Sequence, residues 1–223
     1  MESTGFETEL TVVGPWRSPH QMLAEQEYDG HASVHDEDTA DKLGLAGAPI
    51  EGPTHFSQFD PIGVSFFGQK WFEHGCISSH FENMVIEGED VQASAVQLSP
   101  SLARIGAKKS DGNSVLSGTM TCGPNHPETE LDRRLAGLKD PGELFIVDQL
   151  RVGEESKSFR VSMSFDDSNG HLYPFSLNDK LQHITEPSPW YTHDAGHTSP
   201  WGRAVVPTEM LSVLAHKAGG VGT

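Results

Sequence analysis

Two histidines and four carboxylates lie within the eleven residues from 28 to 38, YDGHASVHDED. Histidine transfers protons near neutral pH, and a carboxylate beside it can orient the ring. His31 and His35 also have the four-residue spacing of helical zinc ligands. No helical pattern surrounds them, however, so the cluster favours acid–base chemistry, and we expect no metal. The alternative without chemistry is a polar loop that caps the following helix.

A second polar group occurs near the C-terminal end, where Tyr191, His193 and Asp194 follow Trp190. Tyr191 could act as an acid or orient a substrate oxygen, and we predict Tyr191 and Asp194 as catalytic candidates. The alternative is that the aromatic residues of this loop only cover a helix. Nucleophilic catalysis is not supported, because the chain has no G-x-S-x-G motif and no phosphate-binding glycine loop.

The charge balance of the chain excludes some partners. Its 32 acidic residues against 15 basic ones give a net charge of -17, which opposes nucleic-acid binding. The two cysteines, Cys76 and Cys122, form no disulfide framework and predict a reducing compartment. The sequence has no apolar run of membrane-spanning length and does not start like a secretion signal, so we expect a cytoplasmic protein without a membrane partner.

The hydrophobic pattern changes from helical to strand-like along the chain. Aromatic and aliphatic residues recur at three- and four-residue spacing over 54–67, which predicts an amphipathic helix, and Pro61 predicts a kink or a new start there. A short helix is also expected up to residue 27. A hairpin turn is predicted at 111–113. Strand-like segments cover residues 10–17, 77–81, 91–98, 104–108, 115–122, 144–152 and 158–165. This mixture predicts an α+β protein.

The chain contains an internal echo. A loop rich in glycine and proline precedes the helix at 54, and a similar loop precedes a predicted helix over 208–217. We interpret this as a pseudo-duplication. The predicted units are residues 1–123, a linker over 124–142, and a second, incomplete unit over 143–223.

These loops carry a resemblance to a known family. Residues 29–40 (DGHASVHDEDTA), Gly44 and residues 48–52 (APIEG) are similar to the active-site pattern of MaoC-like hotdog proteins. Residues 188–194 (SPWYTHD) and 199–207 (SPWGRAVVP) resemble the equivalent loop of their double-hotdog relatives. The family includes (R)-specific enoyl-thioester hydratases and β-hydroxyacyl dehydratases. The resemblance implies a pseudo-duplicated double hotdog, in which a long central helix is wrapped by an antiparallel sheet.

The resemblance also implies roles for individual residues. Asp29 and His35 match the catalytic acid and histidine, although Asp29 lies six residues before His35 where the family has five. His31 is a third candidate, because it could replace the polar group that Ala32 and Ser33 lack. The start of the helix could direct backbone donors to a carbonyl oxygen. Substrate-binding residues are predicted at Gly52, Thr54, His55, Phe56, Phe59, Trp71, Trp190, His193 and Arg203.

The predicted activity is that of a hydratase or dehydratase acting on an α,β-unsaturated or β-hydroxy carbonyl compound, of which an acyl thioester is one option. The acidic charge weakens the coenzyme A thioester reading. Alternatives are a hotdog thioesterase, a lyase or isomerase of a free small molecule, and a non-catalytic ligand-binding protein. No cofactor is expected. Open sheet edges predict a homodimer.

Overall fold

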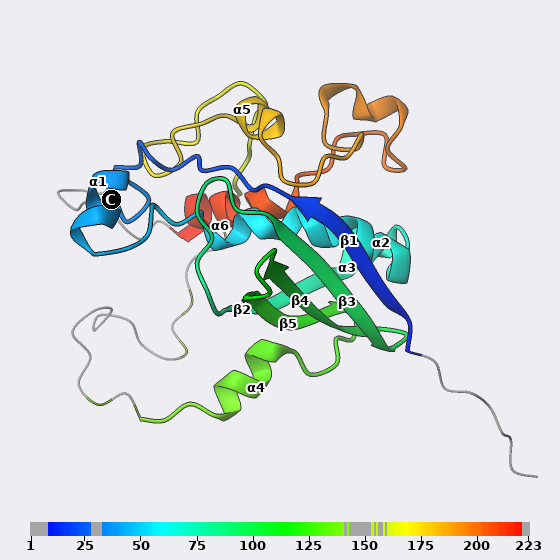
Figure 1. The fold of residues 1–223 in the computed structure, drawn as a ribbon. Coiled ribbons are helices and arrows are strands. Elements are labelled where there is room, and N and C mark those ends of the chain that lie inside the picture. The colour runs from blue at the N-terminus through cyan, green and yellow to red at the C-terminus, as the bar shows by residue number, and fades with distance from the viewer. Residues whose placement is uncertain are drawn as a thin grey trace, which may run out of the picture.

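The structure is a computed structural model that describes residues 9–27, 33–140, 142, 153, 155, 158 and 160–219. Its centre is a five-stranded antiparallel sheet in the order β1-β3-β4-β5-β2 (Figure 1). The strands are β1 (Thr11–Arg17), β2 (Gly75–Phe81), β3 (Val91–Ser99), β4 (Leu102–Lys109) and β5 (Ser114–Cys122). All five were predicted from residue alternation, to within two residues at each end.

One face of the sheet carries small and branched apolar side chains. Val91, Ala93 and Ala95 of β3 are buried and alternate with partly exposed residues, and Ile105 of β4 pairs with Ala95. The strand period of two places all of these on one side. Alanine leaves room for a helix to approach the sheet closely. The β4–β5 hairpin turns at Gly112, whose φ of 90° suits glycine.

The central helix lies against this face in two parts (Figure 1). It begins as the 3₁₀ helix η1 (Gly52–Phe59) and continues as α2 (Asp60–Phe67), followed by α3 (Lys70–His74). The change falls at Asp60-Pro61, as predicted. Proline is tolerated in the first turn of a helix, where its missing N–H has no intrahelical acceptor. Phe59 and Ile62 join the sheet residues in the main core.

The C-terminal part runs along the central helix. Its elements are α5 (Leu177–Gln182), η2 (His193–His197), η3 (Thr208–Met210) and α6 (Leu211–Gly219), and residues 160–219 contain no strand. A second apolar cluster joins Leu23 to Phe175 and Met210. The Thr185 hydroxyl donates to Thr54 O (3.0 Å), and Glu186 N donates to the Ser57 hydroxyl (3.0 Å). These bonds attach the C-terminal part to η1.

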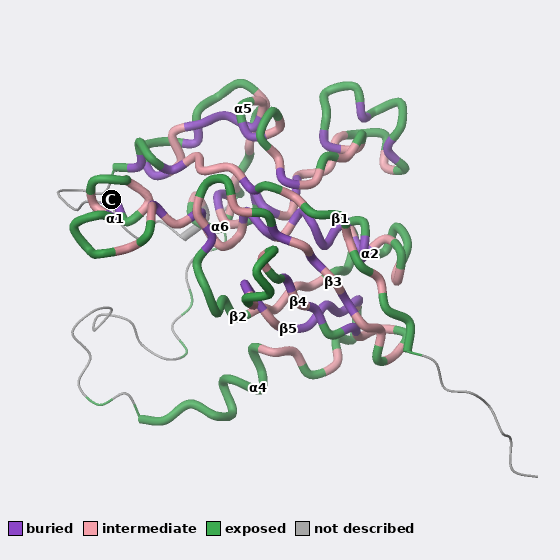
Figure 2. Tube along the Cα trace, in the orientation of Figure 1, coloured by how far each residue is buried: buried purple, intermediate pink, exposed green. Residues whose placement is uncertain are grey.

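Two short helices lie away from the core. Figure 2 shows α1 (Glu37–Lys42) and α4 (Glu130–Ala136) largely exposed, whereas the buried segments follow the strands and the central helix. The start of α4 packs on the outer face of the sheet, where Glu130 N donates to the Thr119 hydroxyl (2.9 Å). In the part of the chain that is described, no helix has the length and apolar character needed to cross a membrane.

The arrangement confirms the predicted α+β hotdog fold for the first part of the chain. The helix predicted before residue 27 is wrong. Residues 21–27 make only a turn, because the buried Gln26 side chain bonds to Leu172 O (2.9 Å) and to the Ser33 hydroxyl (2.8 Å). The strand predicted over 158–165 is also wrong from residue 160 on. The segment 144–152 lies outside the described residues, and the division into units stays a prediction.

Candidate active site

The peptide between Pro49 and Ile50, just before η1, separates two groups of polar side chains. Ile50 N donates to Val85 O (2.7 Å). Pro49 O accepts from His35 Nδ1 (2.5 Å) and from Gln21 Nε2 (2.7 Å). The C=O and N–H of a trans peptide point in opposite directions. His35 therefore lies on one side of this peptide and Val85 on the other.

His35 is held in place by the loop that starts α1. Its backbone N–H donates to the Ser33 hydroxyl (3.2 Å), and the next residue, Asp36, caps α1 by accepting from Thr39 N (2.9 Å). Because a carbonyl only accepts, the bond to Pro49 places the proton of the neutral ring on Nδ1. Nε2 is then the basic nitrogen of His35. Two neighbouring residues of this segment therefore have different roles. Asp36 caps α1, and His35 is oriented so that it can act as a base.

Glu51 follows the Pro49–Ile50 peptide directly in the chain. Its Oε1 accepts a hydrogen bond from the Tyr173 hydroxyl (2.9 Å). Burial raises the pKa of Glu51, while the hydrogen bond from Tyr173 and the electrostatic influence of Lys180 and His35 act in the opposite direction. The carboxyl therefore keeps its proton at a higher pH than an ordinary glutamate. An imidazole and a carboxyl with a raised pKa are the components of an acid–base pair.

A buried ion pair lies close to Glu51. Lys180 Nζ of α5 is 2.7 Å from Glu209 Oε2 of η3, and both side chains are almost fully buried. Thr185 N also donates to Glu209 Oε1 (3.2 Å). The pair compensates two charges in the interior, and Lys180 extends its positive field to Glu51 and His55. It joins the two C-terminal elements beneath the predicted site.

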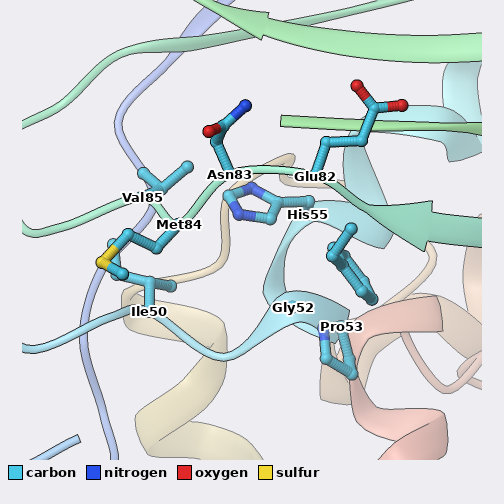
Figure 3. Close-up of a pocket in the computed structure, with 9 residues that line it drawn as sticks. Ile50, Gly52, Pro53, His55, Glu82, Asn83, Met84 and Val85 are labelled. Atoms are coloured by element: carbon cyan, nitrogen blue, oxygen red, sulfur yellow. The ribbon is translucent and has the colours of Figure 1, made fainter. Parts of the chain in front are cut away.

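A pocket of about 340 Å³ lies between the start of η1 and the chain around the end of β2 (Figure 3). His55 of η1 contributes to its wall and is only 2% exposed. Burial, with the charge of Lys180, lowers the pKa of His55 to about 4. The pocket is lined by Ile50, Gly52, Pro53, His55, Phe81, Glu82, Asn83, Met84 and Val85.

Gly52 is required by the close approach of Phe81. A Cβ at position 52 would lie 2.5 Å from Phe81 Cζ, so the ring packs directly against the glycine backbone. Phe56 stacks on the same ring, with centroids 6.0 Å apart. Phe81 therefore covers the start of η1, where the sequence predicted donors for a substrate carbonyl.

The third polar group surrounds Asp60, which the sequence analysis missed. Its Oδ2 accepts from the Tyr191 hydroxyl (2.6 Å) and the Thr208 hydroxyl (2.8 Å), and its Oδ1 accepts from Trp71 Nε1 (2.8 Å). Burial raises the pKa of Asp60 to about 6, against the effect of these donors. The hydrogen bond and the negative charge of Asp60 raise the pKa of the buried Tyr191. In the sequence, the signal for this network was Asp60 itself, a charged residue among the apolar residues of the predicted helix 54–67.

The other predicted residues are spread over the molecule. Asp29 and His31 lie outside the described residues. His193 stacks on Phe165 (3.6 Å between centroids) in η2, whose first turn also contains Asp194. Arg203 is exposed. Trp190 packs edge-to-face on Phe72 and Trp201, Phe59 and Trp71 lie in the main core, and Thr54 is buried. The catalytic and binding roles assigned to these residues stay predictions.

Glu51, Tyr173, Lys180 and Glu209 were not predicted. Glu51 and Tyr173 are 122 positions apart in the chain, so no local spacing connects them. Among the residues that the structure describes, no three His, Cys, Asp or Glu side chains are grouped so as to hold a metal ion.

The known proteins that the chain matches are distant structural neighbours. No family model matches the chain, and no curated protein matches it in sequence. Among solved structures, an (R)-hydratase from A. caviae involved in PHA biosynthesis is 14% identical, with a TM-score of 0.38, and covers 54% of this chain and 100% of its own. A monoamine oxidase regulatory protein from Archaeoglobus fulgius is 14% identical, with a TM-score of 0.36, and covers 52% of this chain and 89% of its own.

A third solved structure, described as a MaoC domain protein dehydratase from Chloroflexus aurantiacus J-10-fl, covers nearly the whole chain. It is 13% identical, with a TM-score of 0.43, and covers 96% of this chain and 72% of its own. Two of these three matching structures are described as a hydratase and as a MaoC domain dehydratase, the kind of protein that the sequence resembles. At identities of 13–14%, the roles of individual residues rest on this chain's own contacts.

Proposed function

We propose that the protein is a hydratase or dehydratase that adds water to an α,β-unsaturated carbonyl compound or removes it from a β-hydroxy one. The observation that carries this proposal is the position of His35. The Nδ1 atom of His35 donates to Pro49 O (2.5 Å). Glu51, two residues after Pro49, has a carboxyl with a raised pKa. An imidazole that can accept a proton and a carboxyl that holds its proton more firmly than usual support the proposal.

In the hydration direction, Nε2 of His35 takes a proton from water as the water oxygen bonds to the β-carbon. The electron pair of the double bond moves to the α-carbon, which receives a proton from the Glu51 carboxyl. Dehydration reverses both transfers. The Tyr173 hydroxyl keeps the Glu51 carboxyl oriented through its hydrogen bond (2.9 Å). Asp29, as the family resemblance implies, is proposed as a further acid at this site.

The proposal is tested by the absorbance of an enoyl group. Purified protein is incubated with a crotonyl thioester and, separately, with crotonamide, which lacks the thiol carrier. Because general acid–base catalysis contributes about 10²- to 10⁴-fold, His35→Ala and Glu51→Gln should each reduce turnover by at least about 100-fold. Glu51→Gln keeps an acceptor for Tyr173, which limits structural damage.

The matched control is His80→Ala. His80 is an exposed residue of β2, and its replacement should leave the rate unchanged. Turnover that persists in folded His35→Ala and Glu51→Gln contradicts the assignment of the pair. Release of free thiol without loss of the conjugated double bond would indicate the thioesterase alternative. Absence of both reactions would favour the non-catalytic ligand-binding alternative.

We also propose that the protein forms a homodimer. The described sheet has two edge strands, β1 and β2, and edge strands present backbone groups that can pair with another chain. Light scattering at micromolar concentration should give twice the chain mass of 24.3 kDa. A monomer mass would contradict the proposal. The cytoplasmic location stays a prediction.

A further inference from the structure

The pocket beside His55 contains one polar side chain that has no partner. Figure 3 shows Glu82 and Asn83 extending away from the imidazole. Both are engaged with β5: Asn83 Nδ2 donates to Ser114 O (2.7 Å), and the Glu82 carboxylate accepts from the Ser117 hydroxyl. In contrast, His55 Nδ1 is buried and has no hydrogen-bond partner among the described residues.

A second unpartnered side chain follows one turn later. Gln58 is 2% exposed, and neither its amide oxygen nor its amide nitrogen has a partner within the described part of the chain. Residues three apart are eclipsed in a 3₁₀ helix, so His55 and Gln58 lie on the same side of η1. Native structures rarely leave buried polar atoms unsatisfied, and such atoms indicate a missing ligand or water.

The charge state of His55 restricts what the pocket could bind. With its pKa lowered to about 4, the imidazole is neutral at neutral pH and has one donor and one acceptor nitrogen. It therefore provides no charge to hold an anion, and the chain's net charge of -17 repels one. A cation would need an inward carboxylate, but Glu82 points away. Ile50, Met84 and Val85 supply apolar walls.

We propose that this pocket binds a small, uncharged organic molecule whose hydroxyl or carbonyl oxygen hydrogen-bonds to His55. A mostly apolar pocket with one polar group that fixes orientation is the usual design of a small-molecule site. Its volume of about 340 Å³ suits a compact ligand. The residues that line the pocket do not include His35, Glu51 or Tyr173 of the proposed acid–base site.

The test uses cyclohexanone as the probe and cyclohexanecarboxylate as its charged counterpart. Binding is followed by NMR of protein with ¹³C-labelled histidine rings. Cyclohexanone should shift the His55 ring resonances in a saturable manner at pH 7, and the carboxylate should not. Replacing the imidazole by an apolar ring of similar size, His55→Phe, should weaken binding about tenfold, as measured by saturation-transfer NMR.

Two further variants make the result decisive. His80→Phe places the same change on an exposed position of β2 and should leave binding unaltered. Met84→Trp enlarges a side chain that lines the pocket and is 43% exposed, so it should block binding while the fold is retained.

Equal binding by His55→Phe and the unmodified protein would overturn the proposal. So would the absence of any probe binding, which would mean that the recess holds only water. Both readouts are binding measurements, so they are independent of whether the protein has lyase activity.

Discussion

The central helix contains two equally buried polar residues with opposite surroundings, His55 in η1 and Asp60 at the start of α2. His55 and Asp60 are both 2% exposed. Asp60 accepts hydrogen bonds from Tyr191, Thr208 and Trp71. His55 Nδ1 has no partner among the described residues. Burial alone therefore does not separate structural polar groups from candidate binding groups on this helix, whereas hydrogen-bond satisfaction does.

The origin of the partners explains the difference. Tyr191 and Thr208 belong to the C-terminal part, so Asp60 connects that part to the sheet-forming part through the first residue of α2. His55 instead faces a pocket formed by η1 and the chain that follows β2. Asp60 thus connects the two parts of the fold, whereas His55 borders a space that a ligand could enter.

The largest expected effect is the loss of the Asp60 carboxylate. Asp60→Ala leaves three donors unpaired, of which those of Tyr191 and Trp71 are buried, and breaking such a network costs about 3–5 kcal/mol of unfolding free energy. Urea unfolding at pH 7 would measure it. Asp60→Asn retains an amide oxygen as acceptor and should cost clearly less. If Asp60→Ala unfolds like the unmodified protein, the network does not stabilise the fold.

The next effect is the pH dependence of the unfolding free energy, to which Asp60 and His55 contribute with opposite signs. The folded-state pKa of Asp60 is raised from 3.8 to about 6, so its contribution is complete below pH 3.8 and is lost as the pH rises through about 6. The folded-state pKa of His55 is lowered from 6.5 to about 4, so its contribution is complete above pH 6.5 and is lost as the pH falls through about 4. Each of these two pKa shifts corresponds to about 3 kcal/mol of unfolding free energy.

The contributions of Asp60 and His55 to the pH dependence can be separated by mutation. Urea unfolding between pH 4 and 7.5 should show that Asp60→Asn loses stability toward acid more steeply than the unmodified protein. His55→Leu should lose stability more steeply as the pH rises. Parallel pH profiles for all three proteins would contradict the assigned pKa directions.

The smallest effect is expected for His55→Leu at pH 7. It removes the buried Nδ1, which has no partner among the described residues, so no hydrogen bond of this atom to them is broken. The unfolding free energy should change by less than about 1 kcal/mol, or increase. Chemical denaturation beside Asp60→Ala provides the comparison. A loss as large as that of Asp60→Ala would mean that His55 has a structural partner after all.

The elements of the fold could be predicted because their signals are local. Strand alternation located β2 to β5, and the spacing of aromatic residues located the central helix, with its change of type at Pro61. The turn over residues 21–27 was misjudged as a helix. The Gln26 side chain in this turn donates to Leu172 O, 146 positions away, and no local sequence pattern predicts that contact.

The candidate site divides in the same way. The sequence by itself determined that imidazole and carboxylate groups precede a helix in the YDGHASVHDED segment, and that the chain resembles MaoC-like proteins. Only the tertiary structure decided that His35 bonds to Pro49 O and that Glu51 meets Tyr173. The physical reason is that a pKa shift or an unpaired buried atom depends on desolvation by distant segments. Residue types set which chemistry is available, and packing sets which groups can perform it.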